Sequence, residues 1–202
     1  MNFFACFVFF LIAFFSQTSV NAAEAYKNVA RAKPEIAVRT DEGTPEYVYK
    51  DKKIECSGSA HHAMGCTRVR FYAVISGSEL TPEGALKKIS LQIGLKNVEI
   101  ELSSELKKGS CLFDAVLKHE LTHLALHRRV LNRFVPEIAK AVLITAQKQR
   151  VPLTQARFDR ITAVLKEYVN RMIEEDDKQN ALMDSKDAYV YQQSQCGEQD
   201  EI

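Results

Sequence analysis

The hydrophobic pattern changes its period near Ser110, and this change restricts the chain to one class of fold. Before that residue, short stretches alternate apolar and polar side chains, which indicates half-buried strands. They lie at 35–40, 46–50, 67–77, 89–94 and 97–103. Afterwards apolar residues recur three and four positions apart, which indicates helices at 110–134, 136–150 and 154–183. Strands followed by helices predict an α+β fold, with a small antiparallel sheet before a helical C-terminal half.

Two further features mark element boundaries. Pro136 follows the first helical stretch and is expected to separate it from the second, because proline removes a helical donor. The segment TPEGALKKI (81–89) predicts a short helix with Thr81 as its N-cap and Pro82 in its first turn.

The N-terminus carries an apolar run from Phe3 to Phe15, followed by the small residues Val20, Ala22 and Ala23. About 13 apolar residues are too few to span a bilayer but suit the central region of a signal peptide. We therefore expect residues 1–22 to be a signal peptide and the mature protein to be exported, without stable membrane insertion. A short membrane anchor or a buried N-terminal helix is the alternative, since 1–7 contains no Lys or Arg.

The rest of the chain suffices for one domain. We expect a loose leader at 23–45 containing one strand, a single domain at 46–196, and a polar tail at 197–202. Residues 1–22 contain no charged side chain, so the formal net charge stays at +1 after cleavage. A charge this close to zero gives no electrostatic reason to expect nucleic acid as a partner.

Four cysteines remain after residue 22, namely Cys56, Cys66, Cys111 and Cys196. An even number in an exported chain predicts two disulfides, although four cysteines allow three pairings. We favour Cys56–Cys66, which closes a short loop, and Cys111–Cys196, which closes a long one. A structural zinc site is the competing interpretation, and the absence of a C-x-x-C pair argues against it.

The segment KHELTHLALH (118–127) contains the pattern H-E-x-x-H. On a helix, His119 and His123 lie on one face, so both imidazoles can reach a single metal ion. Glu120 follows at about 100° of rotation, where its carboxylate can take a proton from a zinc-bound water. The alternative is an amphipathic helix whose histidines face solvent.

A third protein ligand must come from elsewhere. His127 would lie about 12 Å from His119 along an unbroken helix, so we interpret it as a surface residue or a support for a ligand. The candidates are Glu137, Glu174, Glu175, Asp184, Asp187 and the pair His61 and His62.

The favoured long disulfide helps to choose among these candidates. Cys111 lies about ten residues before the midpoint of the two histidines, or roughly 15 Å along the helix. If the C-terminal segment runs antiparallel, ten residues back from Cys196 reaches the region of Asp184 and Asp187. We favour Asp184 as the third ligand, because Asn180 stands one turn before it and could orient it. Solvated charge at a helix end is the alternative.

Two tyrosines come with this segment. Tyr189 and Tyr191 follow Asp184 closely and would arrive beside the same site. We expect the Tyr189 hydroxyl to donate a hydrogen bond to a developing oxyanion.

HELTH resembles the active-site helix of zincin metallopeptidases. Together with GSC (109–111), NALMDSKDAY (180–189) and Cys196, it resembles a family of predicted secreted bacterial zinc-dependent proteases, over roughly residues 88–196. The resemblance implies a Zn²⁺ cofactor held by His119 and His123, Glu120 as general base, and a periplasmic or secreted location. It also implies that a strand such as 97–103 lies along the cleft, where an edge strand can bind an extended peptide.

These observations predict an exported zinc-dependent hydrolase that cleaves a peptide or protein substrate. The longer zincin pattern with a third, glycine-preceded histidine is absent, which leaves the subclass open. The alternatives are a non-catalytic zinc-binding module and an envelope interaction protein whose strand edge binds a partner.

Overall fold

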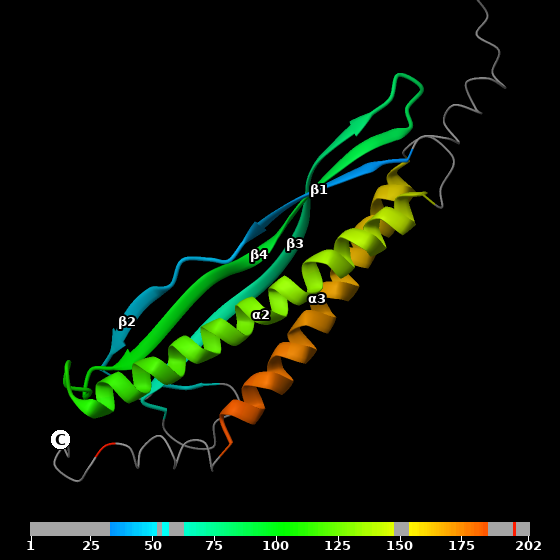
Figure 1. Ribbon diagram of the computed structural model, residues 1–202. Coiled ribbons are helices and arrows are strands. Elements are labelled where there is room, and N and C mark those ends of the chain that lie inside the picture. Colours follow the sequence, from blue (N-terminus) through cyan, green and yellow to red (C-terminus); the bar gives the residue numbers. More distant parts are fainter. Residues whose placement is uncertain (1–32, 52–53, 57–62, 148–153, 186–195, 197–202) are drawn as a thin grey trace, which may run out of the picture.

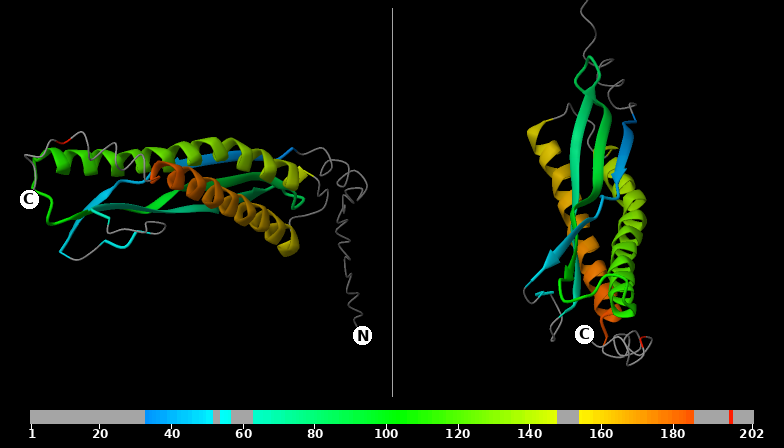
Figure 2. Two further views of the ribbon diagram at one scale, coloured as in Figure 1. Left: turned by 90° about the horizontal axis from the view of Figure 1, so that it is seen from below. Right: turned by 90° about the vertical axis from the view of Figure 1, so that its left-hand side faces the viewer.

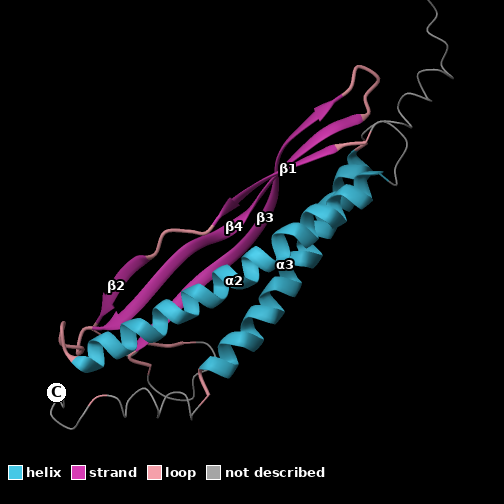
Figure 3. Ribbon diagram, viewed as in Figure 1, coloured by secondary structure: helices cyan, strands magenta, loops and turns pink. Residues whose placement is uncertain are grey.

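A computed structural model describes residues 33–51, 54–56, 63–147, 154–185 and 196. Its elements are β1 (Glu35–Asp41), β2 (Glu46–Lys50), β3 (Gly65–Leu80), β4 (Leu86–Ser103), α2 (Cys111–Gln147) and α3 (Gln155–Met183). Figure 1 shows a long, twisted β3–β4 ribbon with both helices running along it. Figure 3 shows the strands of the first half and the helices of the second, which confirms the predicted α+β fold.

The sheet is mixed. β3 pairs with β4 in antiparallel fashion, as predicted. The prediction is wrong for β1 and β2, which both run parallel to β4 along its other side. Glu35 pairs with Lys88 and Glu46 with Glu99, so the two short strands share one register and form one interrupted edge. Both strands precede β3 in the chain but pair with β4, the strand after it. The long connection through β3 lets the chain return in the same direction, which a parallel pair requires.

A bulge in β4 keeps the apolar side chains before and after it on the same face of the sheet. From Ile89 onward, buried apolar side chains fall on odd-numbered positions before Asn97 and on even-numbered positions after it. They are Ile89, Leu91, Ile93, Leu95, Val98, Ile100 and Leu102. Asn97 has a φ of 51°, and the β3–β4 register shifts opposite it, between Arg68 and Arg70. One extra residue in a strand reverses the alternation of faces, and Asn accepts the left-handed backbone that this requires.

α2 continues through Pro136, so the predicted break into two helices at this residue is wrong. Phe134 and Ile138, on either side of the proline, are buried against the rest of the core. Burial of the residues around Pro136 offsets the loss of one helical hydrogen bond.

The helix predicted at 81–89 is also wrong. Gly84 N–H donates to the carbonyl of Thr81, and Thr81 N–H donates to the carbonyl of Ala85, so this segment forms the turn of the β3–β4 hairpin. Gly84 has a φ of 79°, which suits a tight turn. β4 begins directly afterwards at Leu86, whose side chain is buried.

The helices pack on the face of the sheet that β4 buries. α2 contacts β1, β3 and β4, while α3 contacts α2 and β3. Figure 2 shows the two helices lying along the strands in both views. At the start of α2, the Ser110 hydroxyl accepts a hydrogen bond from Phe113 N–H, which confirms Ser110 as the N-cap. Of the helices in the described part of the chain, none combines the length and apolar character needed to cross a membrane.

Both predicted disulfides are confirmed. Cys56 is bonded to Cys66, and Cys111 is bonded to Cys196. The strand predicted within the leader is also confirmed, and as β1 it is part of the sheet, so the ordered domain begins before residue 46. The signal peptide (1–22) and the polar tail (197–202) lie outside the described residues.

Candidate metal centre

His119 and His123 face each other from successive turns of α2. Both are buried, with 4% and 7% of their surface exposed. Their Nε2 atoms are 3.0 Å apart, and the rings are nearly perpendicular, with centroids 4.6 Å apart. Two imidazole nitrogens at this separation converge on one point, as the i, i+4 spacing predicts.

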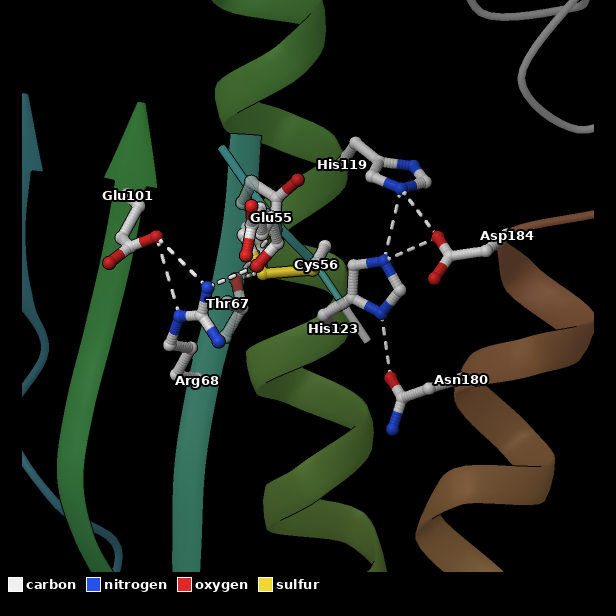
Figure 4. Close-up of a disulfide and its surroundings, with 11 residues drawn as sticks. Glu55, Cys56, Thr67, Arg68, Glu101, His119, His123, Asn180 and Asp184 are labelled. Atoms are coloured by element: carbon white, nitrogen blue, oxygen red, sulfur yellow. Dashed lines mark hydrogen bonds and ion pairs between the residues drawn. A yellow bond between two sulfur atoms is a disulfide. The ribbon is translucent and has the colours of Figure 1, made fainter. Parts of the chain in front are cut away.

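Asp184 completes a triangle of ligand atoms. It caps the C-terminus of α3, and its backbone N–H donates to the carbonyl of Asn180. Its Oδ1 lies 3.0 Å from Nε2 of His119 and 2.9 Å from Nε2 of His123. Figure 4 shows the Asp184 side chain directed from α3 toward both imidazoles. Ligand atoms about 2.0–2.1 Å from a tetrahedral ion lie about 3.3 Å apart, so a small expansion fits an ion. His119, His123 and Asp184 therefore form a group that can hold a metal ion.

Asn180 determines which nitrogen of His123 is available to a metal. The Asn180 side-chain N–H donates to the backbone carbonyl of Asp176, which directs Oδ1 of Asn180 toward His123. That oxygen lies 2.6 Å from Nδ1 of His123 and accepts its proton. When the ring is neutral, the lone pair of His123 is then on Nε2, the atom that faces Asp184.

Glu120 is held on the side of α2 that faces β3. Its exposed fraction is 4%, and the Thr67 hydroxyl lies 2.8 Å from its Oε2 and 2.9 Å from its backbone carbonyl. Gly65 lies against the same carboxylate. A Cβ at Gly65 would approach Oε1 of Glu120 to 2.7 Å and Val116 to 2.9 Å. Only glycine leaves the room that this carboxylate occupies.

The charges of the cluster oppose the effect of burial. Burial raises the pKa of Glu120, and the Thr67 hydrogen bond and the two histidines oppose that rise. Burial lowers the pKa of His123, but its bonds to Asp184 and Asn180 outweigh burial and raise it. Burial raises the pKa of Asp184, but hydrogen bonds from both imidazoles hold it well below its ordinary value. The site therefore places one buried carboxylate beside a group of side chains that can hold a cation.

β3, not β4, is the strand beside the site. The resemblance to zincins implied that a strand such as 97–103 lies along the cleft, and these residues are the C-terminal part of β4. β4 is paired on both sides, with β2 along one edge and β3 along the other. β3 carries Gly65 and Thr67, and among the described residues only β4 pairs with it. The expectation that 97–103 forms an edge strand is therefore wrong, because β2 pairs with one side of this segment and β3 with the other.

Of the other ligand candidates, some are described and lie outside this group, and the rest are not among the described residues. Glu137 pairs with Arg171, Glu175 pairs with Arg133, and Glu174 is exposed on α3; none of the three belongs to the ligand group. His127 is also outside that group, and its Nδ1 lies 2.7 Å from Asp176. His61, His62, Asp187, Tyr189 and Tyr191 lie outside the described residues.

The sequence did not predict three residues that contact the site, namely Asp176, Gly65 and Thr67. Asp176 had a signal, because Asp176, Asn180 and Asp184 repeat the four-residue spacing of the three histidines. Gly65 and Thr67 had none, since a glycine and a threonine at the start of a strand are ordinary there. Their roles depend on how β3 lies against α2, which only the fold specifies.

The chain was compared with protein-family models, curated proteins and solved structures, and none of them matches. The metal-binding geometry is therefore the basis for a functional proposal.

Proposed function

We propose that this protein is an exported zinc-dependent hydrolase, a metallopeptidase with Glu120 as its general base. The observation that carries the proposal is the convergence of two imidazole nitrogens and one carboxylate oxygen about 3 Å apart. A buried carboxylate adjoins them on the same helix. This set of residues is the one that the H-E-x-x-H pattern requires.

Zinc is the metal that best fits these ligands. Zn²⁺ prefers imidazole nitrogen with carboxylate oxygen, and catalytic zinc sites use three protein ligands with a fourth position left for water or substrate. The described residues supply three such ligands. When bound, zinc supplies a Lewis acid and lowers the pKa of a water molecule.

The chain's own residues then perform three tasks. His119, His123 and Asp184 hold the ion at the junction of α2 and α3. Glu120 accepts a proton and can return it to a leaving amine, and burial favours this role because it raises the carboxylate's pKa toward neutrality. Thr67 and Gly65 keep that carboxylate against β3.

The edge of β3 is the proposed place for a substrate. An extended peptide can add to a free strand edge through main-chain hydrogen bonds, which suits a peptide or protein of little sequence preference. Gly65 and Thr67 bring the start of this edge next to Glu120. A peptide aligned along β3 would then pass the metal centre.

Export is supported by the two disulfides. Such bonds form and persist in oxidising compartments such as the periplasm or the extracellular space. The apolar run at 3–15 is consistent with the same route.

The proposal is tested by metal analysis and by peptide cleavage with the mature protein. We expect about one zinc per wild-type chain and little in His123→Ala. Glu120→Gln should retain zinc but lose at least about a hundredfold in turnover, since general acid–base catalysis typically contributes 10²–10⁴-fold. Glu137→Gln is the matched control, because it makes the same change on the exposed side of α2 and should alter neither quantity.

Two outcomes would contradict the proposal. Equal zinc content in wild type and His123→Ala would remove the metal centre. Zinc binding without cleavage of any peptide in a diverse library would instead favour a non-catalytic zinc-binding protein.

A further inference from the structure

Three pairs of residues connect α2 to α3 in one regular series. His119 is paired with Asp184, His123 with Asn180, and His127 with Asp176. Each step moves four residues forward on α2 and four residues back on α3. Only the first two pairs include metal ligands, which leaves the third pair without a role in the proposed chemistry.

The third pair is the most deeply enclosed of the series. His127 is 7% exposed and Asp176 is 6% exposed, whereas the Asp184 side chain is 36% exposed. Nδ1 of His127 lies 2.7 Å from Oδ1 of Asp176, and Phe71 packs edge-on against the imidazole. A buried carboxylate is tolerated only with such a partner, so this contact strongly favours one alignment of the two helices.

Asp176 also connects the third pair to the metal centre. Its backbone carbonyl accepts the hydrogen bond that orients Asn180, and Asn180 in turn accepts the Nδ1 proton of His123. Asp184 lies one turn beyond Asn180 at the end of α3. The contact at Asp176 therefore fixes the turn of α3 that presents both Asn180 and Asp184.

We propose that His127 and Asp176 are positioning residues of the metal centre, acting through Asn180 on His123 and through the alignment of α3 on Asp184. This inference rests on the proposed zinc site. Residues that orient a metal ligand from behind typically contribute 10–100-fold in metal affinity. We expect a loss of this size when the pair is broken.

The test measures the zinc dissociation constant by competition with a chelator, using the full mature chain with its disulfides intact. Asp176→Ala should weaken zinc binding at least about tenfold. Leu165→Ala is the matched control, because Leu165 is buried in α3 but lies outside the three pairs. It should lower stability by roughly 2–5 kcal/mol and leave zinc affinity within about threefold of wild type.

A second readout separates positioning from stability. Cobalt(II) bound in place of zinc reports ligand geometry through its visible absorption spectrum. Asp176→Ala should change this spectrum, and Leu165→Ala should not. If Asp176→Ala does not fold, Asp176→Asn replaces it, because the amide retains the side-chain volume and one acceptor for His127. We expect an intermediate loss of affinity from it.

The outcomes distinguish this inference from the proposed function. A folded Asp176 variant with wild-type zinc affinity and an unchanged cobalt spectrum would overturn the positioning role and leave the metal site standing. A loss equal to that of Leu165→Ala would reduce the pair to ordinary packing, which also overturns it. A wild-type protein that binds no zinc would contradict the proposed function, and the role assigned to this pair would fall with it.

Discussion

Gly65 faces Glu120 across the contact between β3 and α2, and its missing side chain determines where the carboxylate lies. A methyl group there would stand 2.7–2.9 Å from the carboxylate and from Val116, closer than side chains tolerate. Nothing in the sequence distinguishes this glycine from others. The motif predicts a role for Glu120, but the space that its carboxylate needs depends on a strand more than 50 positions earlier.

Gly65→Ala should lower the free energy of unfolding by roughly 1–3 kcal/mol, because the added methyl group overpacks the contact. It should also lower peptide turnover, since Glu120 must move. Gly77→Ala, in the same strand, is the control, because its nearest neighbour would be 3.8 Å away. Urea unfolding and a cleavage assay would check both effects, and identical behaviour of the two variants would contradict this account.

Thr67 provides the hydroxyl that satisfies the buried Glu120 carboxylate. Thr67→Val retains the shape but leaves the carboxylate without this donor, and should cost about 1–3 kcal/mol of unfolding free energy. Thr67→Ser retains the donor and should cost less. Unfolding curves of the two proteins, compared at matched zinc content, measure the difference. A valine variant as stable as the serine variant would show that the hydroxyl contributes nothing.

At the scale of elements, the sequence predicted what alternation and helical spacing encode, and missed what pairing and packing decide. The predicted strands are present, and the change from odd to even apolar positions was visible around Asn97. The parallel pairing of β1 and β2 was not predictable, because alternation specifies a face but not a partner. Likewise, a proline predicts a helix end only where packing on both sides is too weak to oppose it.

Pro136→Ala should therefore stabilise the protein. Pro136 is exposed, so the substitution removes no packing, and alanine restores a backbone donor inside α2. We expect the free energy of unfolding to rise by roughly 1–3 kcal/mol. Lys140→Ala, exposed one turn later, should change it by only a few tenths. Chemical denaturation of both variants measures these free energies of unfolding. A Pro136→Ala protein less stable than wild type would contradict the prediction and show that the proline stabilises α2.

For the whole molecule, the proposed metal site joins two helices that also meet through apolar packing and through polar pairs such as His127 with Asp176. α2 contributes two ligands and α3 contributes one, so a bound ion would bridge them. The sequence predicted all three residues of this group, because the motif specified two of them and the long disulfide placed Asp184 at the level of the two histidines. The sequence did not predict the third helix-to-helix pair, because the four-residue spacing shared by the two helices does not by itself specify that His127 meets Asp176.

Zinc should stabilise the whole domain through this bridge. At a free zinc concentration about one hundred times the dissociation constant, binding adds about 2.7 kcal/mol to the free energy of unfolding. For a chain of this size this corresponds to a rise in Tm of roughly 5–10 °C. His123→Ala should show no rise, and a chelator should reverse it in the wild type. Thermal scans with and without zinc test this, and an equal shift in both proteins would indicate binding elsewhere.

The order of the ligands along the chain has a consequence for synthesis. Asp184 follows His119 by 65 residues and His123 by 61, so it is synthesised well after both of them. A nascent chain that has released α2 but not the end of α3 carries only two of the three ligands. Under the proposed function, a chain that stops before residue 184 lacks one of the three residues of this group and is expected to be inactive as a hydrolase.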